Sequence, residues 1–278
     1  MIDFTLRKYR QLLLTLQQQG YQFLTFEQYC VSSTASPASD LQAEGRSSSE
    51  SDLPSKYIIL RHDVDLKAAN SLATAQIEQE LGIQASYYFR VVPQSNQPDM
   101  IRAIAHLGHE IGYHYEDMAI CQGNHQQAYE HFLKQLAYFR QFYPVRTICM
   151  HGAPTSQWDG KELWKHYNYH DLDIIGEPYF DVDFSQLFYL TDTGRSWDGY
   201  KVSVRDKIPV YQDQWIAQGL VYHTTQDIIR AAEQGSLPHR IMITTHPQRW
   251  TDQPLAWTKE LVLQSLKNVV KRLFFVKK

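Results

Sequence analysis

The chain has 278 residues, of which 43% are hydrophobic, enough to build one sizeable buried core. Its 27 Lys and Arg residues against 30 Asp and Glu residues give a formal net charge of −3. There is no excess positive charge to attract a phosphate backbone, so nucleic acid is excluded as the principal partner.

Cysteine usage and the apolar segments bear on the cell compartment. The three cysteines are Cys30, Cys121 and Cys149, and they have neither a zinc-type spacing nor the even number expected of a disulfide framework. We therefore expect reduced thiols in a cytoplasmic protein. The first residues lack the apolar region of a signal peptide, and no stretch reaches the length of a membrane span.

The first 55 residues divide into two parts. Residues 1–30 carry apolar side chains at helical spacing, followed by Gly20 and a strand-like run, and predict a helix and a short strand packed on the main domain. Residues 31–55 are rich in Ser, Ala, Pro, Asp and Glu, a composition too polar to form a core. We expect this second part to be a disordered insertion.

Residues 56–278 alternate between strand-like and helix-like patterns. Predicted strands lie at 57–60, 85–90, 109–113, 146–150, 174–175, 187–191 and 240–245. Predicted helices lie at 66–81, 101–107, 126–142, 161–166, 224–233 and 254–275, the last of them amphipathic. Repeated strand-then-helix units imply a parallel sheet, and their number favours an α/β fold with a closed or nearly closed barrel.

Polar side chains follow many of these strands, at the end where β/α barrels assemble their active sites. They are Asp63, Asp65, Arg90, His114, His151, Asp192 and His246. Carboxylates and imidazoles gathered at one end of a sheet are the donors of a hydrolytic metal site.

Asp63 and Asp65 are two residues apart, so in an extended backbone both side chains point to the same side. One can then bind a metal while the other acts as a base. Alternatively, the pair consists of solvated carboxylates or caps of the following helix.

His114 is flanked by Glu116 and Asp117, which concentrates nitrogen and oxygen donors suited to zinc or another divalent ion. A hydrogen-bonded barrel histidine is the alternative. His151 follows the strand at 146–150 and is either a ligand, a substrate contact or an ordinary loop histidine.

His246 ends the last predicted strand, where it can protonate a leaving amine or simply cap the strand. The loop that begins at Asp192 also contains Arg195 and Trp197. There Arg195 can clamp an anion or orient the base, and Trp197 can stack on a sugar ring. Surface ion pairing and packing are the alternatives for both.

The order of these motifs resembles the polysaccharide deacetylase superfamily, the NodB-homology fold also called carbohydrate esterase family four. The likeness extends from Lys56 to about Trp250 and is closest to a divergent branch associated with bacterial surface-polysaccharide gene clusters. It implies a distorted (β/α)7 barrel, here with an N-terminal helical extension. It also implies a divalent metal, usually zinc, that serves to remove N-acetyl or O-acetyl groups from sugars.

The resemblance also assigns roles. The run Arg61-His62-Asp63-Val64-Asp65 is similar to the family's first motif, with Asp63 as base and Asp65 as metal ligand. The run 108–112, Gly-His-Glu-Ile-Gly, is similar to the second, with His114 as the first metal histidine. The family's second metal histidine falls at Met118, a poor ligand for a hard ion. Either His151, Glu116 or Asp117 completes the site, with His151 favoured over Glu116, or the metal is weakly held.

The later motifs, an Asp with a nearby Trp and a strand that ends in His, resemble 192–197 and 241–246. Together with the chemistry of the residues described above, this leads us to expect catalytic roles for Asp192, Arg195 and His246 and substrate contacts for Arg90 and Trp197. We therefore predict a zinc-dependent hydrolase that deacetylates a carbohydrate or sugar-nucleotide substrate. Two alternatives stay open: a catalytically silent carbohydrate-binding barrel, suggested by Met118 and the many aromatic residues, and an amidohydrolase acting on a small cyclic amide.

Overall fold

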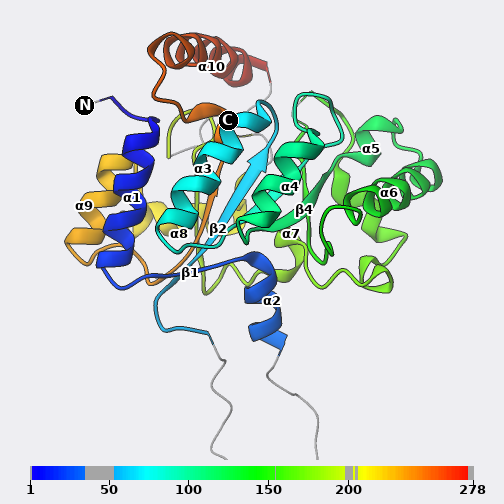
Figure 1. Cartoon of the computed structure of the whole chain (residues 1–278), viewed down its shortest axis with the longest axis horizontal. Helices are drawn as coiled ribbons and strands as arrows, with labels where there is room; N and C mark the ends of the chain where they lie inside the picture. Colours follow the sequence, from blue (N-terminus) through cyan, green and yellow to red (C-terminus); the bar gives the residue numbers. More distant parts are fainter. Residues whose placement is uncertain (1, 35–52, 154, 198–202, 204–205, 275–278) are drawn as a thin grey trace, which may run out of the picture.

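A computed structural model describes residues 2–34, 53–153, 155–197, 203 and 206–274. In it a parallel sheet is surrounded by helices, with the C-terminal helix α10 lying on the outside of the molecule (Figure 1). Among the described helices, none combines the length and the hydropathy needed to cross a bilayer.

All the strand pairs of the sheet are parallel. The order is β5-β4-β3-β2-β7-β6, and β1 pairs with the first half of β2. The strands are β1 (Gln22–Leu24), β2 (Tyr57–Val64), β3 (Ser86–Phe89), β4 (Glu110–Tyr115), β5 (Ile148–Met150), β6 (Phe188–Thr191) and β7 (Arg240–Thr245). Every residue of β2 is buried, as expected of a central parallel strand covered on both faces.

The sheet curls into a half-barrel, which confirms the predicted α/β fold of the distorted-barrel type. The opening lies between β5 and β6, since no ladder joins these two strands in the described part of the chain. The strand predicted at 174–175 is not a regular strand. Its neighbour Gly176 instead forms a single parallel bridge with Thr147, beside β5.

The α-helices are α1 (Leu6–Gln18), α2 (Phe26–Thr34), α3 (Ala68–Glu80), α4 (Pro98–His106), α5 (Asp117–Ile120), α6 (His125–Phe139), α7 (Pro178–Asp181), α8 (Pro209–Ala217), α9 (Thr225–Glu233) and α10 (Pro254–Phe274). Short 3₁₀ helices are η1 (Gly160–Lys165), where a helix was predicted, η2 (Tyr169–Leu172) and η4 (Pro247–Arg249). The sequence explains where two of the helices begin. Thr224 and Asp227 form a capping box at the start of α9, and Pro98 is the first residue of α4.

The N-terminal part packs on the sheet assembly. Helix α1 lies against α3 and α9, and its Tyr9 hydroxyl donates a hydrogen bond to the buried Glu78, which also pairs with His62 of β2 at 2.7 Å. Helix α2 was not predicted and continues to Thr34, so its last four residues fall within the segment predicted as disordered. Residues 35–52 lie outside the described residues, and the prediction for them is untested.

Gly112 of β4 shows why a motif residue is a glycine. A Cβ built there would overlap the ring of Tyr88 on β3 and lie 3.0 Å from the carbonyl oxygen of Thr147. The missing side chain therefore lets β4 sit close to its neighbours, directly before His114.

Candidate metal centre

A cavity of about 530 Å³ lies at the carboxyl ends of β2, β4, β5 and β7. Asp63 is in β2 and Asp65 follows that strand, His114 is near the end of β4, His151 comes directly after β5, and His246 directly after β7. All five line the cavity. The parallel sheet thus brings together side chains from distant parts of the chain, as its topology predicts.

Asp65, His114 and His151 converge on one point of this cavity. Oδ1 of Asp65 lies 3.6 Å from Nε2 of His114 and 3.4 Å from Nε2 of His151. One donor atom from each of the three residues lies within 4.8 Å of the others. One carboxylate oxygen and two imidazole nitrogens are a ligand set used by zinc and similar divalent ions.

Both imidazoles are held with Nε2 toward this point. Nδ1 of His114 donates to the backbone carbonyl of Cys149 at 2.9 Å, and Nδ1 of His151 donates to the Glu116 carboxylate at 2.8 Å. Since each Nδ1 carries the proton, each Nε2 offers a lone pair. Burial lowers the pKa of His114 to about 4, so its imidazole is neutral at pH 7, as a metal ligand must be.

The Asp65 carboxylate provides the clearest sign that a cation fits here. Its Oδ2 accepts a hydrogen bond from Nε2 of Gln248 at 3.2 Å, whereas its buried Oδ1 has no hydrogen-bond partner among the described residues. A buried, unpaired carboxylate oxygen is costly unless something positive faces it. The position of Oδ1 between two imidazole lone pairs therefore fits a divalent cation.

A second group, Asp63, His114 and Cys149, is also close enough to hold an ion. It is a poorer site, because both oxygens of Asp63 already accept hydrogen bonds from Arg61. Burial also raises the pKa of the Cys149 thiol well above its ordinary value, and the thiolate is the form that binds metals.

Glu116 and Arg90 do not occupy the positions predicted for them. Glu116, the alternative metal ligand, lies behind His151 as its hydrogen-bond acceptor. Arg90, predicted to contact substrate, makes a two-pronged ion pair with Glu116 at 2.8 and 2.9 Å and is absent from the cavity lining. These two residues orient the histidine instead, because a carboxylate behind a ligand imidazole fixes its ring and its tautomer.

Asp63 lies beside the three donors and is tied to Arg61, which the sequence prediction missed. Nε and Nη2 of Arg61 reach the two oxygens of Asp63 at 2.8 and 2.7 Å, and both side chains are buried. Burial alone would raise the pKa of Asp63, but the guanidinium holds it well below its usual range. Asp63 is therefore an ionised, fixed carboxylate at the cavity wall.

His246, at the end of the neighbouring strand β7, is paired with Asp192. Nδ1 of His246 lies 2.7 Å from Oδ1 of Asp192, and its Nε2 lies 3.8 Å from Oδ2 of Asp65. The buried Asp192 also accepts hydrogen bonds from Arg249 and from the indole of Trp250. Burial and Arg249 oppose protonation of His246, but Asp192 outweighs them, so the pKa of His246 is raised above its ordinary value.

Arg195 and Trp197 lie away from these groups, contrary to prediction. The guanidinium of Arg195 stands 5.1 and 4.9 Å from the ring centres of Phe4 and Trp257, in cation–π geometry. The buried indole of Trp197 donates to Thr225 at 2.9 Å. The guanidinium and indole that reach Asp192 come from Arg249 and Trp250 instead.

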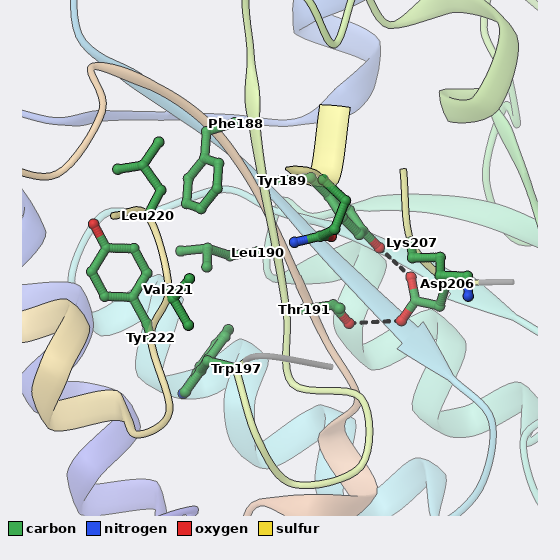
Figure 2. A pocket seen from close by; sticks show the side chains of 11 residues that line it. Phe188, Tyr189, Leu190, Thr191, Trp197, Asp206, Lys207, Leu220, Val221 and Tyr222 are labelled. Carbon is green, nitrogen blue, oxygen red and sulfur yellow. Dashed lines mark hydrogen bonds between the residues drawn. The ribbon is translucent and has the colours of Figure 1, made fainter. Parts of the chain in front are cut away.

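Figure 2 shows the surroundings of Trp197, a second cavity walled by β6 and the segment that contains Tyr222. Its volume is about 20 Å³, room for about one water molecule and not for a sugar ring. Asp206 lines both this cavity and the larger one, and it accepts hydrogen bonds from Tyr189, Thr191 and Thr193. Trp197 therefore belongs to the packing behind the main cavity.

Met118, which stands where the resemblance expects the second metal histidine, is buried on α5 and does not line the cavity. His151 is the histidine that joins Asp65 and His114 in space. The three candidate donors thus come from three strand ends.

Some of the missed residues had a signal in the sequence. Arg61 precedes Asp63 by two positions in a strand, so both side chains had to share a face. Gln248, Arg249 and Trp250 lie two to four residues after His246, in a stretch rich in hydrogen-bond donors. The pairing of Glu116 with His151 spans 35 residues, and no local pattern reveals it.

No family model matches the chain, and no curated protein matches it. Several solved structures match the chain. The first is BA3943, described as a CE4 family pseudoenzyme from Bacillus anthracis, with 12% identity and a TM-score of 0.42. The alignment covers 78% of this chain and 61% of that one. The chain is similar to CE4 family proteins.

Two further CE4-type structures match. The Xyl-CE4 domain of a multidomain xylanase from the hindgut metagenome of Trinervitermes trinervoides has 12% identity and a TM-score of 0.39, covering 78% of this chain and 85% of that one. The Bc1960 peptidoglycan N-acetylglucosamine deacetylase has 14% identity and a TM-score of 0.40, covering 76% and 82%. CE4 is carbohydrate esterase family four, the family that the sequence motifs resemble.

Proposed function

We propose that this protein is a metal-dependent hydrolase that removes an acetyl group from an acetamido or O-acetyl sugar. The observation that carries the proposal is the buried, unpaired Oδ1 of Asp65, 3.6 and 3.4 Å from the Nε2 atoms of His114 and His151. The motifs from Arg61 to His246 that resemble carbohydrate deacetylases support the choice of reaction. A cytoplasmic location is part of the same proposal and follows from the cysteine usage.

Asp65, His114 and His151 would hold the cation, and zinc suits one oxygen and two nitrogen donors. A divalent ion at this position supplies Lewis acidity: it polarises a carbonyl and lowers the pKa of a water molecule from about 15.7 toward about 7.

The residues around this point divide the proton transfers between them. Asp63, ionised and immobilised by Arg61, accepts the proton of the attacking water. His246, whose pKa is raised chiefly by Asp192 against the effect of burial, donates a proton to the departing nitrogen or oxygen of the sugar. A low-pKa carboxylate and a high-pKa imidazole at neighbouring strand ends are the pairing expected of a base and an acid.

The cavity suits a sugar-sized ligand. Its volume of about 530 Å³ lies within the range of about 300–1,000 Å³ typical of small-molecule sites. Beyond the charged groups, Thr193, Ser203 and Asp206 line it with hydroxyl and carboxylate oxygens, which suit the hydroxyl groups of a carbohydrate or sugar nucleotide.

The test compares Asp65→Ala and His114→Ala with His106→Ala, an exposed histidine on α4 that serves as the control. Metal content and acetate release from a panel of acetamido sugars and their nucleotide-linked forms are measured for each. We expect both site variants to lose the metal and the activity together, with folding unchanged, while His106→Ala keeps both. Full activity in either site variant would refute the assignment.

The same measurements address the two other candidate functions. Met118 at the usual histidine position favours a protein that binds sugars without turnover, and sugar affinity without metal or acetate release would establish that function. Ring opening of a small cyclic amide to a product with a new carboxylate and amine, without acetate release, would indicate a hydrolase of such amides.

A further inference from the structure

Helix α10 is turned with its polar side toward the body of the protein. Gln264 is buried, Glu260 forms an ion pair with Lys67 at 3.1 Å, and Nδ2 of Asn268 donates to the carbonyl of Gly194 at 2.8 Å. These contacts recur every three or four residues along one face of the helix, so they fix its rotation about its axis.

The opposite face of α10 carries exposed apolar side chains. Leu255, Val262 and Val269 are 88%, 52% and 55% exposed and follow one another at intervals of seven residues, about two helical turns. We call these three residues the outer face. A surface helix normally buries its apolar face, so this orientation is the reverse of the usual one. Apolar side chains held outward along one face of a helix mark an interaction surface.

The charge of the C-terminal segment points to the partner. Residues 254–278 contain six Lys and Arg residues and one Glu, a net charge of +5. The rest of the chain then has 21 basic and 29 acidic residues, a net charge of −8. A basic, apolar segment on an acidic protein is attracted to anionic lipid headgroups, which take up its apolar side chains as well.

A second copy of the chain is a less suitable partner. A helix of 21 residues is about 31 Å long and about 10 Å wide, so two such faces would bury only about 600 Å² in total. Stable protein interfaces bury about 1,200 Å² or more. Two segments of +5 would also repel each other.

The helix connects this surface with the cavity. Leu263, Leu266 and Val270 line the main cavity, so α10 forms part of its wall as well as the outside of the molecule in Figure 1. We propose that α10 lies in the headgroup region of an anionic membrane, with its outer face among the acyl chains, and places the mouth of the cavity next to the bilayer.

Vesicle flotation of the full-length protein tests this proposal. The vesicles contain phosphatidylcholine alone or with about a third phosphatidylglycerol. We expect at least tenfold tighter binding to the anionic vesicles, weakened by salt. The double variant Val262→Gln/Val269→Gln should lose at least tenfold in affinity while melting at the wild-type temperature, because both side chains face solvent and neither lines the cavity.

The matched control is Val210→Gln/Ile216→Gln on α8, where the side chains are also exposed. It should bind vesicles as the wild type does. The proposal is overturned if the wild type does not float with anionic vesicles, if the α10 variant floats unchanged, or if the α8 variant loses binding equally. A concentration-dependent dimer that the α10 variant abolishes, without vesicle binding, would show that the outer face joins two copies instead.

Discussion

Replacing Glu116 by Gln tests whether the carboxylate behind His151 belongs to the metal site. Glu116 accepts from Nδ1 of His151 at 2.8 Å and is itself fixed by Arg90. A glutamine oxygen can still accept this hydrogen bond, so the ring keeps its orientation and only the negative charge is lost. Loss of such a partner usually costs 10–100-fold in metal affinity, equivalent to about 1.4–2.7 kcal/mol.

Zinc affinity is measured by competition with a chelator, which needs no substrate and therefore does not depend on the proposed reaction. Glu130→Gln, an exposed carboxylate on α6, is the matched control. We expect a 10–100-fold rise in the zinc dissociation constant for Glu116→Gln and none for Glu130→Gln. Equal affinities for wild type and Glu116→Gln would contradict the argument that Glu116 and Arg90 hold His151 as a ligand.

Three further outcomes are expected. Activity that needs protonated His246 is present below its pKa and lost as pH rises. Asp192→Asn should therefore move the alkaline limb of kcat/KM to lower pH by about one unit, since it exchanges a charged for a neutral hydrogen bond. Met118→His should not tighten zinc binding and should cost about 1–3 kcal/mol in denaturant unfolding, because the position is buried away from the cavity. Gly112→Ala should cost about 1–3 kcal/mol in the same assay, because the new methyl group overlaps the ring of Tyr88.

The sequence predicted the sheet well because its signals are local. Buried parallel strands are short apolar runs bounded by polar residues. The polar residue that follows such a run lies at the carboxyl end of its strand, on the same edge of the sheet as the others. Asp65, His114 and His151 were placed at that edge from strand order alone, and the structure brings them together. Helices α2 and α8 were missed, since their apolar residues do not repeat with a clear helical period.

The errors concern residues whose partners are distant in the chain. Arg195 and Trp197 were chosen because they follow Asp192 closely, yet Asp192 takes its guanidinium and its indole from Arg249 and Trp250, 57 and 58 residues away. Arg90 was predicted to contact substrate because it follows a strand, but its guanidinium forms an ion pair with Glu116. A sequence pattern predicts at which edge of the sheet a side chain lies. It does not predict with which of the charged side chains at that edge it forms an ion pair or a hydrogen bond.

His151, which we propose as a ligand in place of a histidine on α5, is held firmly in position. The backbone N–H of His151 donates to the carbonyl of Tyr115 at 2.8 Å. Its Nδ1 donates to the side chain of Glu116, the residue that follows Tyr115. His151 is thus fixed both by its backbone and by its ring to the end of β4, the strand that carries His114. The strand register, with Tyr115 opposite Met150, sets the separation of the two imidazoles. In the proposed metal site, parallel pairing of β4 with β5 therefore fixes the spacing of the two imidazoles beside the Asp65 carboxylate.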